Sequence, residues 1–338
     1  MLVKRFSFSL TTLIVLVSCA GTYFINEYLH HKIHQITDNT ISEINAQSGI
    51  VRNKMARLEG YRLIKPLIYS EQEAESPNYS NLKTQLNTYI EQLKNSQKLI
   101  SASIYIREFD HGEWMCINDT ESFYPGSLIK VPGMITYLKM AEKNPALLNK
   151  KIVFNTPNSA IPNQTFGSKQ ILHGKEYTIR ELLKYMISYS DNNATYLLNR
   201  NVDLNVFRQI FSDLNIPSFY QKNSTITAKN FSVFFKVLFN GSYLTRDNSE
   251  FALELLQGCD FKLGMIKGVP VNTIVAHKFG EMGDSTSRQL HESGLVYINN
   301  KPYLLTIMTK GYSTRELPKI IGTISKMVYQ DFISKSIN

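Results

Sequence analysis

The sequence predicts an α+β fold in which one antiparallel sheet is built from both ends of the chain and flanked by helices. Segments that alternate between apolar and polar residues, as strands do, form two groups far apart in the chain: 101–109 and 112–118, then 273–279, 294–298 and 303–309. The stretch between these groups, about 120–260, has mostly helical patterning. We therefore expect an all-helical subdomain inserted between the two halves of the sheet.

The bulk composition argues for a globular protein without a nucleic-acid partner. Apolar residues make up 43% of the 338-residue chain and charged residues 19%, an ordinary globular mixture. The net charge is +9, but Lys and Arg are spread along the chain without a dense basic block or a nucleic-acid motif. A positive surface that faces anionic lipid or an anionic cell wall is the better interpretation of this charge.

The first 25 residues have the pattern of a membrane-targeting segment. Basic residues at positions 4 and 5 precede an apolar run over 6–25 that only Ser, Thr, Cys and Gly interrupt. Positive charge before such a run is typical of exported proteins and keeps the start of the chain in the cytoplasm. About 20 apolar residues also suffice to span a bilayer, so we expect 1–25 to remain as a signal anchor. The rest of the chain would then lie outside the bacterial cytoplasmic membrane, in a periplasmic or extracellular location.

A second interpretation of the same segment is a lipoprotein signal. Residues 16–19, Leu-Val-Ser-Cys, resemble the point at which such signals are processed, and Cys19 would then carry the lipid. The apolar run continues beyond Cys19, which favours the uncleaved anchor. Under either interpretation the chain meets the membrane through its N-terminus.

Between this segment and the main folded domain the sequence predicts a juxtamembrane stalk over 26–80. The stretch is polar with scattered isoleucines, and a break that contains Pro77 and several acidic or small residues covers 71–80. We place the main folded domain at 81–338. The sequence does not indicate whether the stalk pairs with a second copy of the chain.

Helices within the domain are predicted from their apolar faces and their caps. A helix over 82–93 opens the domain, and an apolar helix over 128–140 begins the inserted part. A third helix starts at Thr178, with Glu181 in capping-box spacing. The chain ends in a helix over 314–333, which is expected to pack on the sheet.

Two serines share the spacing Ser-x-x-Lys. Ser80 and Lys83 introduce a polar amphipathic helix, where a serine is expected as an N-cap. Ser127 and Lys130 follow Tyr-Pro-Gly and begin an apolar helix, so their side chains share one helix face. Backbone N–H groups at a helix start stabilise developing negative charge, and a nearby amine accepts a proton. The sequence therefore predicts Ser127 as an acyl-transfer nucleophile with Lys130 as its base.

Two further motifs follow in the chain. Ser190-Asp191-Asn192 comes after a helix and, taken alone, is common as a polar turn. Lys278-Phe279-Gly280 ends an alternating, strand-like run. Gly280 would let a substrate backbone approach the strand edge closely, and Lys278 would offer a fixed positive charge to a carboxylate.

In this order the three motifs resemble the signature of class A β-lactamases and penicillin-binding proteins. The resemblance extends over about 82–333 and includes the order of the elements, which implies a β-lactamase/transpeptidase-like fold. The Tyr-Pro-Gly-Ser sequence that ends at Ser127 is more similar to D-alanyl-D-alanine carboxypeptidases than to typical β-lactamases.

The resemblance also implies the catalytic roles. Ser127 would attack a carbonyl to form an acyl-enzyme, Lys130 would take its proton, and Ser190 would relay a proton to the leaving nitrogen. Lys130 must be neutral for part of the time to act as a base, and burial together with Lys278 would lower its pKa.

The substrate-binding roles are implied in the same way. Asn192 would hold the side-chain amide of the substrate and Lys278 its carboxylate, with Gly280 beside them. The backbone N–H groups of Ser127 and Glu281 would form the oxyanion hole. We expect no metal and no cofactor.

Two departures from the family pattern bear on function. The family's loop glutamate, which activates the deacylating water, has no counterpart in 199–227, where the acids are Asp203 and Asp213 alone. We therefore expect slow hydrolysis of the acyl-enzyme unless Glu281 or another group substitutes. Phe279 stands where the family usually has Thr or Ser, so it either points into the core or marks a different substrate. Arg288 is a candidate for the missing carboxylate contact.

The sequence thus predicts an exported active-site-serine hydrolase that acts on a β-lactam or a D-alanyl-D-alanine-type peptide of the cell wall. One alternative is an amidase of another substrate class. A second alternative is a β-lactam-binding or sensing module with little turnover. Cys116 and Cys259 are predicted as two buried thiols, because two isolated cysteines form no disulfide framework.

Overall fold

The computed structural model describes residues 53–155, 165–217, 224–283, 286–298 and 301–337. Lys54–Asn338 forms one compact unit. The predicted anchor and the predicted stalk up to residue 52 lie outside the described residues. Within the described ranges, no helix is both long enough and apolar enough to cross a bilayer.

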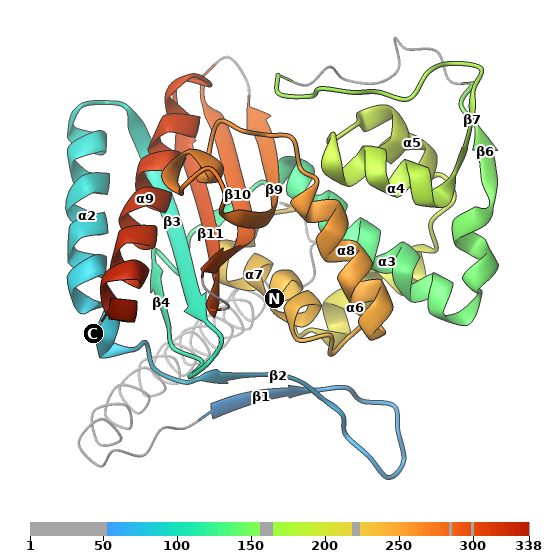
Figure 1. Cartoon of the computed structure of the whole chain (residues 1–338), viewed down its shortest axis with the longest axis horizontal. Coiled ribbons are helices and arrows are strands. Elements are labelled where there is room, and N and C mark those ends of the chain that lie inside the picture. The colour runs from blue at the N-terminus through green and yellow to red at the C-terminus, as the bar shows by residue number, and fades with distance from the viewer. Residues whose placement is uncertain (1–52, 156–164, 218–223, 284–285, 299–300, 338) are drawn as a thin grey trace, which may run out of the picture. The chain divides into compact units, whose positions relative to one another are not determined.

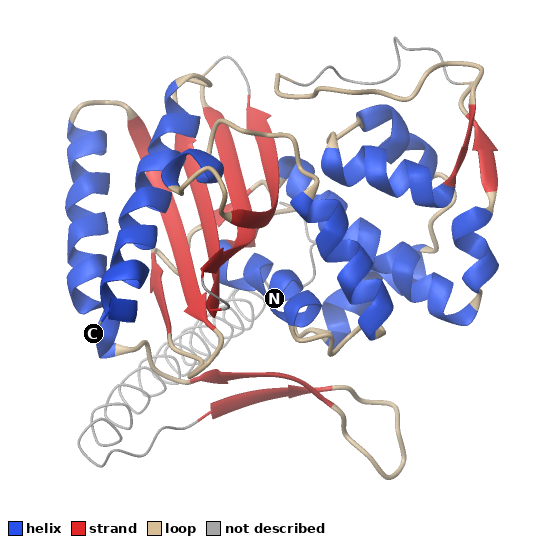
Figure 2. Ribbon diagram, viewed as in Figure 1, coloured by secondary structure: helices blue, strands red, loops and turns tan. Residues whose placement is uncertain are grey.

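A five-stranded antiparallel sheet joins the two ends of the domain (Figures 1 and 2). Its strand order is β4-β3-β11-β10-β9. The N-terminal strand β3 pairs with the C-terminal strand β11, with Ile104 opposite Ile307. The strands are β3 (Leu99–Glu108), β4 (Trp114–Ile117), β9 (Ile274–Gly283), β10 (Arg288–Ile298) and β11 (Lys301–Gly311). The α+β class and the assembly of the sheet from both chain ends are confirmed.

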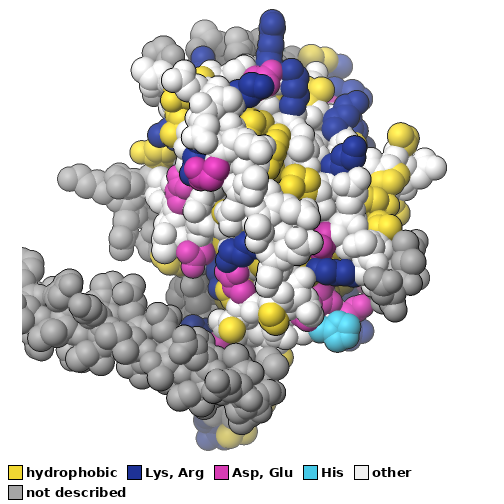
Figure 3. Space-filling model, turned by 90° about the vertical axis from the view of Figure 1, so that its left-hand side faces the viewer, with side chains coloured by type: hydrophobic (Ala, Val, Ile, Leu, Met, Phe, Trp, Pro, Cys, Tyr) yellow, Lys and Arg dark blue, Asp and Glu magenta, His cyan; other side chains and the backbone are white. Residues whose placement is uncertain are grey.

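Two long helices cover one face of the sheet (Figure 1). They are α2 (Ser80–Asn95) and the C-terminal helix α9 (Glu316–Ile337). Helix α2 buries Leu82, Leu86 and Ile90, the face that its sequence pattern predicts. These side chains pack in one cluster with residues of the sheet such as Ile104. On the side of the molecule that carries α2, acidic and basic side chains share the surface (Figure 3).

The opposite face of the sheet packs against the inserted helical part, which the sequence predicts at about 120–260. Tyr105 and Met308, on this face, belong to one core cluster with residues of these helices such as Phe234. The helices are α3 (Lys130–Lys143), α4 (Ile179–Ser188), α5 (Asn192–Asn199), α6 (Leu204–Asp213), α7 (Ala228–Phe239) and α8 (Arg246–Gln257). Helix α4 has the predicted capping box, in which Thr178 and Glu181 satisfy each other's backbone N–H groups.

The part of the predicted stalk that the structure describes is instead folded onto the domain. Strands β1 (Asn53–Arg57) and β2 (Leu67–Gln72) form a hairpin, and β2 carries Glu71 into the interior. The Glu71 carboxylate accepts hydrogen bonds from Tyr105 Oη at 2.5 Å and from Lys236 Nζ at 2.7 Å. From the sequence, a glutamate in a polar stretch is expected to be exposed to solvent. Its burial could not be predicted, because the buried lysine that neutralises it lies 165 residues away.

Both cysteines of the domain are buried free thiols, as predicted. Cys116 belongs to the core on the helical side of the sheet and Cys259 to the core beneath α2 and α9. The sheet therefore separates the two thiols.

Candidate active site

Ser127 lies in a 3₁₀ turn rather than in the first turn of an α-helix. The turn, η2 (Gly126–Ile129), leads into α3, which begins at Lys130. The predicted helix start at residue 128 is therefore two residues early. Ser127 is half-buried and lines a cleft of about 550 Å³ together with Lys130, Asn192 and Glu281.

The turn that carries Ser127 packs directly against strand β9. A Cβ atom added to Gly126 would lie 2.4 Å from the carbonyl oxygen of Glu281, and Gly126 also has a φ of +52°. A Cβ atom on Gly280 would lie 2.2 Å from the carbonyl oxygen of Pro125. Gly280 was predicted to admit a substrate backbone, but the backbone of the nucleophile turn occupies that approach. Its role in the structure is to let β9 pack against this turn.

The Ser190-Asp191-Asn192 motif forms the strained link between α4 and α5. Ser190 has a φ of +56°, a conformation that costs a non-glycine residue about 1–3 kcal/mol and is concentrated at functional sites. The Asp191 carboxylate caps α5 by accepting from the backbone N–H of Asn193 at 2.8 Å, and it also accepts from that of Ile171 at 2.8 Å. Asp191 thereby fixes the backbone on which Ser190 and Asn192 stand.

The three motifs meet around the hydroxyl of Ser190. Lys278 Nζ donates to Ser190 Oγ at 2.8 Å, and Lys130 Nζ donates to the same oxygen at 3.2 Å. Lys130 Nζ also donates to the Ser190 carbonyl at 2.5 Å and to Asn192 Oδ1 at 2.9 Å. Within the described ranges, the hydrogen bonds of Lys130 Nζ go to Ser190 and Asn192 and not to Ser127 Oγ, although Ser127 and Lys130 line the same cleft.

Both lysines are buried, and this sets their charge states. Burial, with the positive charge of Lys278 as the second cause, lowers the pKa of Lys130 well below its ordinary 10.5. Burial also lowers the pKa of Lys278, to about 8. An amine whose pKa is depressed in this way spends part of its time neutral near physiological pH, as a general base requires.

Lys278 and Phe279 are neighbours in β9, and the Lys278 ammonium lies 4.1 Å from the centroid of the Phe279 ring. The phenyl ring is fully buried beneath α9 and stacks on Phe261 with ring centroids 4.5 Å apart. Phe279 therefore belongs to the core, the first of the two predicted alternatives. Lys278 is fully buried against Ser190, whereas the exposed Arg288 lines the cleft.

Glu281 closes one side of the cleft. Its carboxylate accepts hydrogen bonds from the backbone N–H groups of Thr165 at 2.8 Å and Phe166 at 3.2 Å. These bonds hold the segment that begins at Thr165 against the cleft, of which both residues form part of the wall. The Glu281 side chain thus has a structural task in addition to the backbone N–H predicted for the oxyanion hole.

His291 positions the nucleophile turn, a role that the sequence does not indicate. Its Nε2 donates to the Tyr124 carbonyl at 2.9 Å, and its Nδ1 accepts from the backbone N–H of Thr309 at 3.2 Å. Burial lowers the pKa of His291 to about 4, so the ring is neutral and has one donor and one acceptor. A histidine in a strand pattern carries no signal for such a role, because Tyr124 is 167 residues away.

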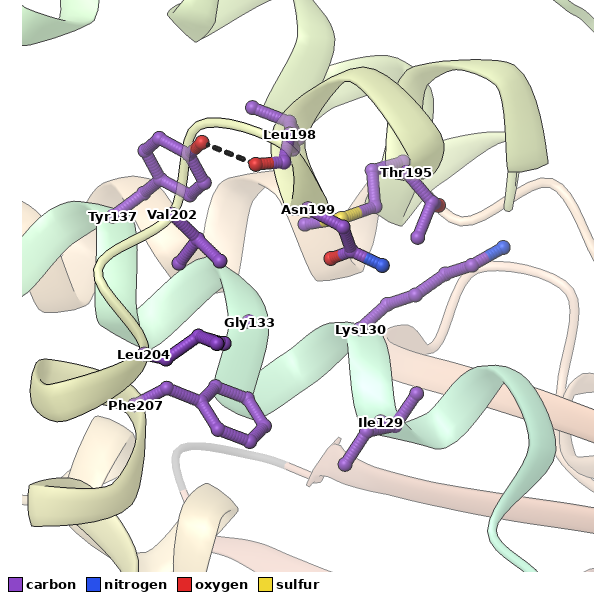
Figure 4. Close-up of a pocket in the computed structure, with 11 residues that line it drawn as sticks. Ile129, Lys130, Gly133, Tyr137, Thr195, Leu198, Asn199, Val202, Leu204 and Phe207 are labelled. Carbon is purple, nitrogen blue, oxygen red and sulfur yellow. Dashed lines mark hydrogen bonds between the residues drawn. The ribbon is translucent and has the colours of Figure 1, made fainter.

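A second cavity, of about 320 Å³, lies beside Lys130 between α3, α5 and α6 (Figure 4). It shares Ile129, Lys130 and Thr195 with the catalytic cleft. In Figure 4, Asn199 and Thr195 of α5 project toward the side chain of Lys130. No carboxylate is among the residues that line this cavity in the described part of the chain.

The two acids of 199–227 serve structural purposes. Asp203 caps α6 by accepting from the backbone N–H of Asn205 at 2.8 Å. Asp213 accepts from Tyr243 Oη at 2.6 Å and from Gln209 Nε2 at 2.7 Å. Neither residue lines the cleft or the neighbouring cavity.

The other Ser-x-x-Lys pair is separate from this site. Lys83 pairs with Glu75 at 2.5 Å, and Ser80 Oγ donates to the Pro77 carbonyl at 2.6 Å. Ser80 was predicted as the N-cap of α2, but it is the first helical residue, and its hydroxyl bonds to the preceding turn.

Comparisons with known proteins agree with this architecture. The model of the β-lactamase enzyme family matches residues 81–332. A β-lactamase from Bacteroides uniformis is 24% identical over 276 residues, which cover 73% of this chain and 90% of the relative. Since the family match covers most of the chain, the protein belongs to the β-lactamase enzyme family. It is a serine hydrolase of the β-lactam type that acts on amide bonds.

Solved structures of the same fold align with this chain over nearly their whole length. A mutant of PBP-A, solved as an acyl-enzyme complex with penicillin G, matches with a TM-score of 0.61 at 20% identity over 74% of this chain and 97% of its own. The β-lactamase from Francisella tularensis matches with a TM-score of 0.63 at 19% identity over 74% and 99%. The class A β-lactamase from Mycobacterium abscessus gives 0.62 at 16% over 73% and 99%. The predicted β-lactamase/transpeptidase-like fold is therefore confirmed.

Proposed function

We propose that Ser127 is acylated by a β-lactam or a D-alanyl-D-alanine-type peptide. The observation that carries this proposal is the buried cluster in which Lys130 and Lys278 both contact the hydroxyl of Ser190, next to a cleft that Ser127 lines. Such a cluster supplies a nucleophile, a base of lowered pKa and a route for the proton.

In the proposed acylation, neutral Lys130 takes the proton of Ser127 as the serine oxygen bonds to the substrate carbonyl. Catalytic hydrogen bonds are often long without substrate and tighten when it binds. When the carbon–nitrogen bond then breaks, Ser190 donates its proton to the leaving nitrogen and receives one from Lys130. Ser190 Oγ accepts from both lysines, which places the relay hydroxyl within hydrogen-bond distance of the base.

Charge on the substrate is balanced from two sides of the cleft. The backbone N–H groups of Ser127 and Glu281 form the proposed oxyanion hole, consistent with the close packing of β9 on η2. For the substrate carboxylate we propose Arg288 as the direct contact, since it is the cation exposed in the cleft. Lys278 adds positive potential from behind Ser190, and Asn192 faces the substrate amide.

The acyl-enzyme is proposed to be long-lived. The one carboxylate in the cleft wall within the described ranges is Glu281, and its Oε1 already accepts two backbone N–H groups. The cavity beside Lys130 is mainly apolar and has no acid in its lining. A slow second step favours a carboxypeptidase or a penicillin-binding function over rapid β-lactam hydrolysis. The alternatives are an amidase of another substrate class, which substrate profiling distinguishes, and a sensing module, which measurement of turnover distinguishes.

We further propose that the protein is exported and held at the bacterial cytoplasmic membrane through residues 1–25. The hairpin of β1 and β2 supports a location near lipid. Its connection exposes Tyr61, Leu63 and Ile64 by 54%, 83% and 58%, and Arg62 and Lys65 lie among them. Apolar side chains interspersed with basic ones are typical of surfaces that contact anionic membranes.

The acylation is tested by incubating the full chain, in detergent, with penicillin and following its intact mass over time beside Ser127→Ala. A persistent adduct on the parent protein alone is the expected result. An adduct that forms and disappears within seconds would contradict the slow second step. Absence of any adduct on the parent would move the substrate away from β-lactams and favour the amidase alternative.

A further inference from the structure

A glycine near the start of α3 borders the cavity between α3, α5 and α6. Gly133 lies one turn after Lys130 in α3 and lines the cavity. A Cβ atom added to Gly133 would meet no atom within 4 Å. Glycine is less favourable than alanine in a helix by up to about 1 kcal/mol, and no neighbouring atom excludes a larger side chain at this position. What glycine preserves at this position is the empty space.

The walls of this cavity suit an apolar group. Leu198, Val202 and Phe207 contribute aliphatic and aromatic surface. The hydroxyl of Tyr137 is engaged with the Leu198 carbonyl at 2.6 Å, so Tyr137 offers only its ring (Figure 4). A volume of about 320 Å³ is at the lower end of small-molecule sites, roughly 300–1,000 Å³, and fits a single ring or a short alkyl chain.

The polar side chains of the cavity lie on the side that faces the catalytic residues. Thr195 and Asn199 project toward Lys130 in Figure 4, while Phe207 and Leu204 lie at the other end. Thr195 and Lys130 also line the catalytic cleft, so the two spaces adjoin. A bound molecule that reaches from the cleft into the cavity would pass polar groups first and apolar groups afterwards.

We propose that this cavity is a specificity subsite for an apolar arm on the acyl group that is transferred to Ser127. The favoured substrate is an acyl donor whose amide lies near Asn192 and whose alkyl or aryl end enters between α3 and α6. This inference rests on the proposed function, because it takes Ser127 as the acylated residue. It adds that the acyl side, rather than the leaving group, determines which substrates react best.

The subsite is tested with penicillins that differ only in an acetyl or an octanoyl side chain, and with N-methyloctanamide as an unreactive probe. The octanoyl compound should acylate the full chain at least about tenfold faster than the acetyl compound, the smallest discrimination expected from a filled apolar pocket. Gly133→Leu should remove this preference by filling the cavity. Val202→Phe narrows the cavity from the link between α5 and α6, and it replaces Gly133→Leu in the test if that variant does not fold. Thr88→Leu on α2 places the same side chain on an exposed helix position and should keep the preference.

Binding of N-methyloctanamide to Ser127→Ala, measured by calorimetry, separates this inference from the proposed function. Binding that Gly133→Leu weakens at least about tenfold supports the subsite even if no penicillin reacts. Equal acylation by both penicillins together with no amide binding would overturn the subsite and leave the proposed acylation intact. Neither acylation nor amide binding would overturn both.

Discussion

Lys278 Nζ lies 2.8 Å from Ser190 Oγ and donates a hydrogen bond to it, although the two residues are 88 positions apart in the chain. Lys130 Nζ approaches the same oxygen at 3.2 Å. The Ser190 hydroxyl therefore connects all three motifs, through its contacts with Lys130 and Lys278. This arrangement makes Ser190 the point at which a proton can cross from the base to the leaving group.

Replacement of Ser190 by alanine should slow acylation by roughly 10²–10⁴-fold, the range for loss of a general acid–base group. Ser190→Ala removes the relay oxygen while Ser127 and Lys130 stay in place. The measurement is the rate of penicillin adduct formation by quenched-flow mass spectrometry. Ser122→Ala, at an exposed position, is the matched control. A loss of less than threefold for Ser190→Ala would remove the relay from the mechanism.

The acylation rate should rise with pH through the lowered pKa of Lys130. The neutral amine is the active form, and burial followed by the charge of Lys278 shifts its pKa well below 10.5. Activity should therefore appear at lower pH than a solvent-exposed lysine would allow, and fall as acidification protonates the amine. The profile of adduct formation against pH is the measurement. Lys130→Ala should abolish this rise; a profile that it leaves unchanged would exclude Lys130 as the base.

Introduction of a carboxylate beside Lys130 should accelerate hydrolysis of the acyl-enzyme. Asn199 projects toward Lys130 in Figure 4 from the wall of the apolar cavity. Asn199→Asp should shorten the lifetime of the penicillin adduct by about tenfold or more, since positioned general bases contribute about 10²–10⁴-fold. Asn199→Ala enlarges the same space without adding an acid and should leave the lifetime nearly unchanged. Equal lifetimes in the two variants would show that the carboxylate does not reach the water.

The buried charge of Glu71 should make the stability of the domain depend on pH. Burial alone would raise the pKa of this carboxyl, but the ammonium groups of Lys236 and Lys229 lower it to about 2, below its ordinary 4.5. A carboxyl with a depressed pKa stabilises the fold fully above pH 4.5, and the contribution is lost as the pH falls from 4.5 toward 2. Acid titration of the parent by circular dichroism should therefore show weakening within this window.

Glu71→Gln should lower the free energy of unfolding near pH 7 by about 3 kcal/mol, because it leaves Lys236 as a buried charge without its partner. Urea denaturation is the measurement. The exposed pair of Glu59 with Lys65 provides the control, since Glu59→Gln removes a solvated ion pair and should change stability by less than about 1 kcal/mol. Equal effects of the two variants would mean that the hairpin is not part of the cooperative unit.

The local features of the domain could be predicted from residue patterns because their causes are local. The apolar face of α2 repeats at helical spacing, and the capping box of α4 needs only Thr178 and Glu181. The order of the three motifs likewise predicted that Ser190 and Lys278 would approach Lys130. The position of Ser127 in a 3₁₀ turn was missed, because the geometry of that turn depends on Gly126 packing against Glu281 in a distant strand.

The sequence by itself determined the fold class, the family motifs and the absence of a glutamate from 199–227. Tertiary structure alone decided that Glu71 is buried, that the Phe279 ring packs in the core beside Lys278, and that Gly133 opens onto a cavity. The physical reason is the range of the interactions. Side-chain periodicity and caps act within a few residues, whereas the neutralisation of a buried charge and the shape of a cavity depend on residues brought together only by folding.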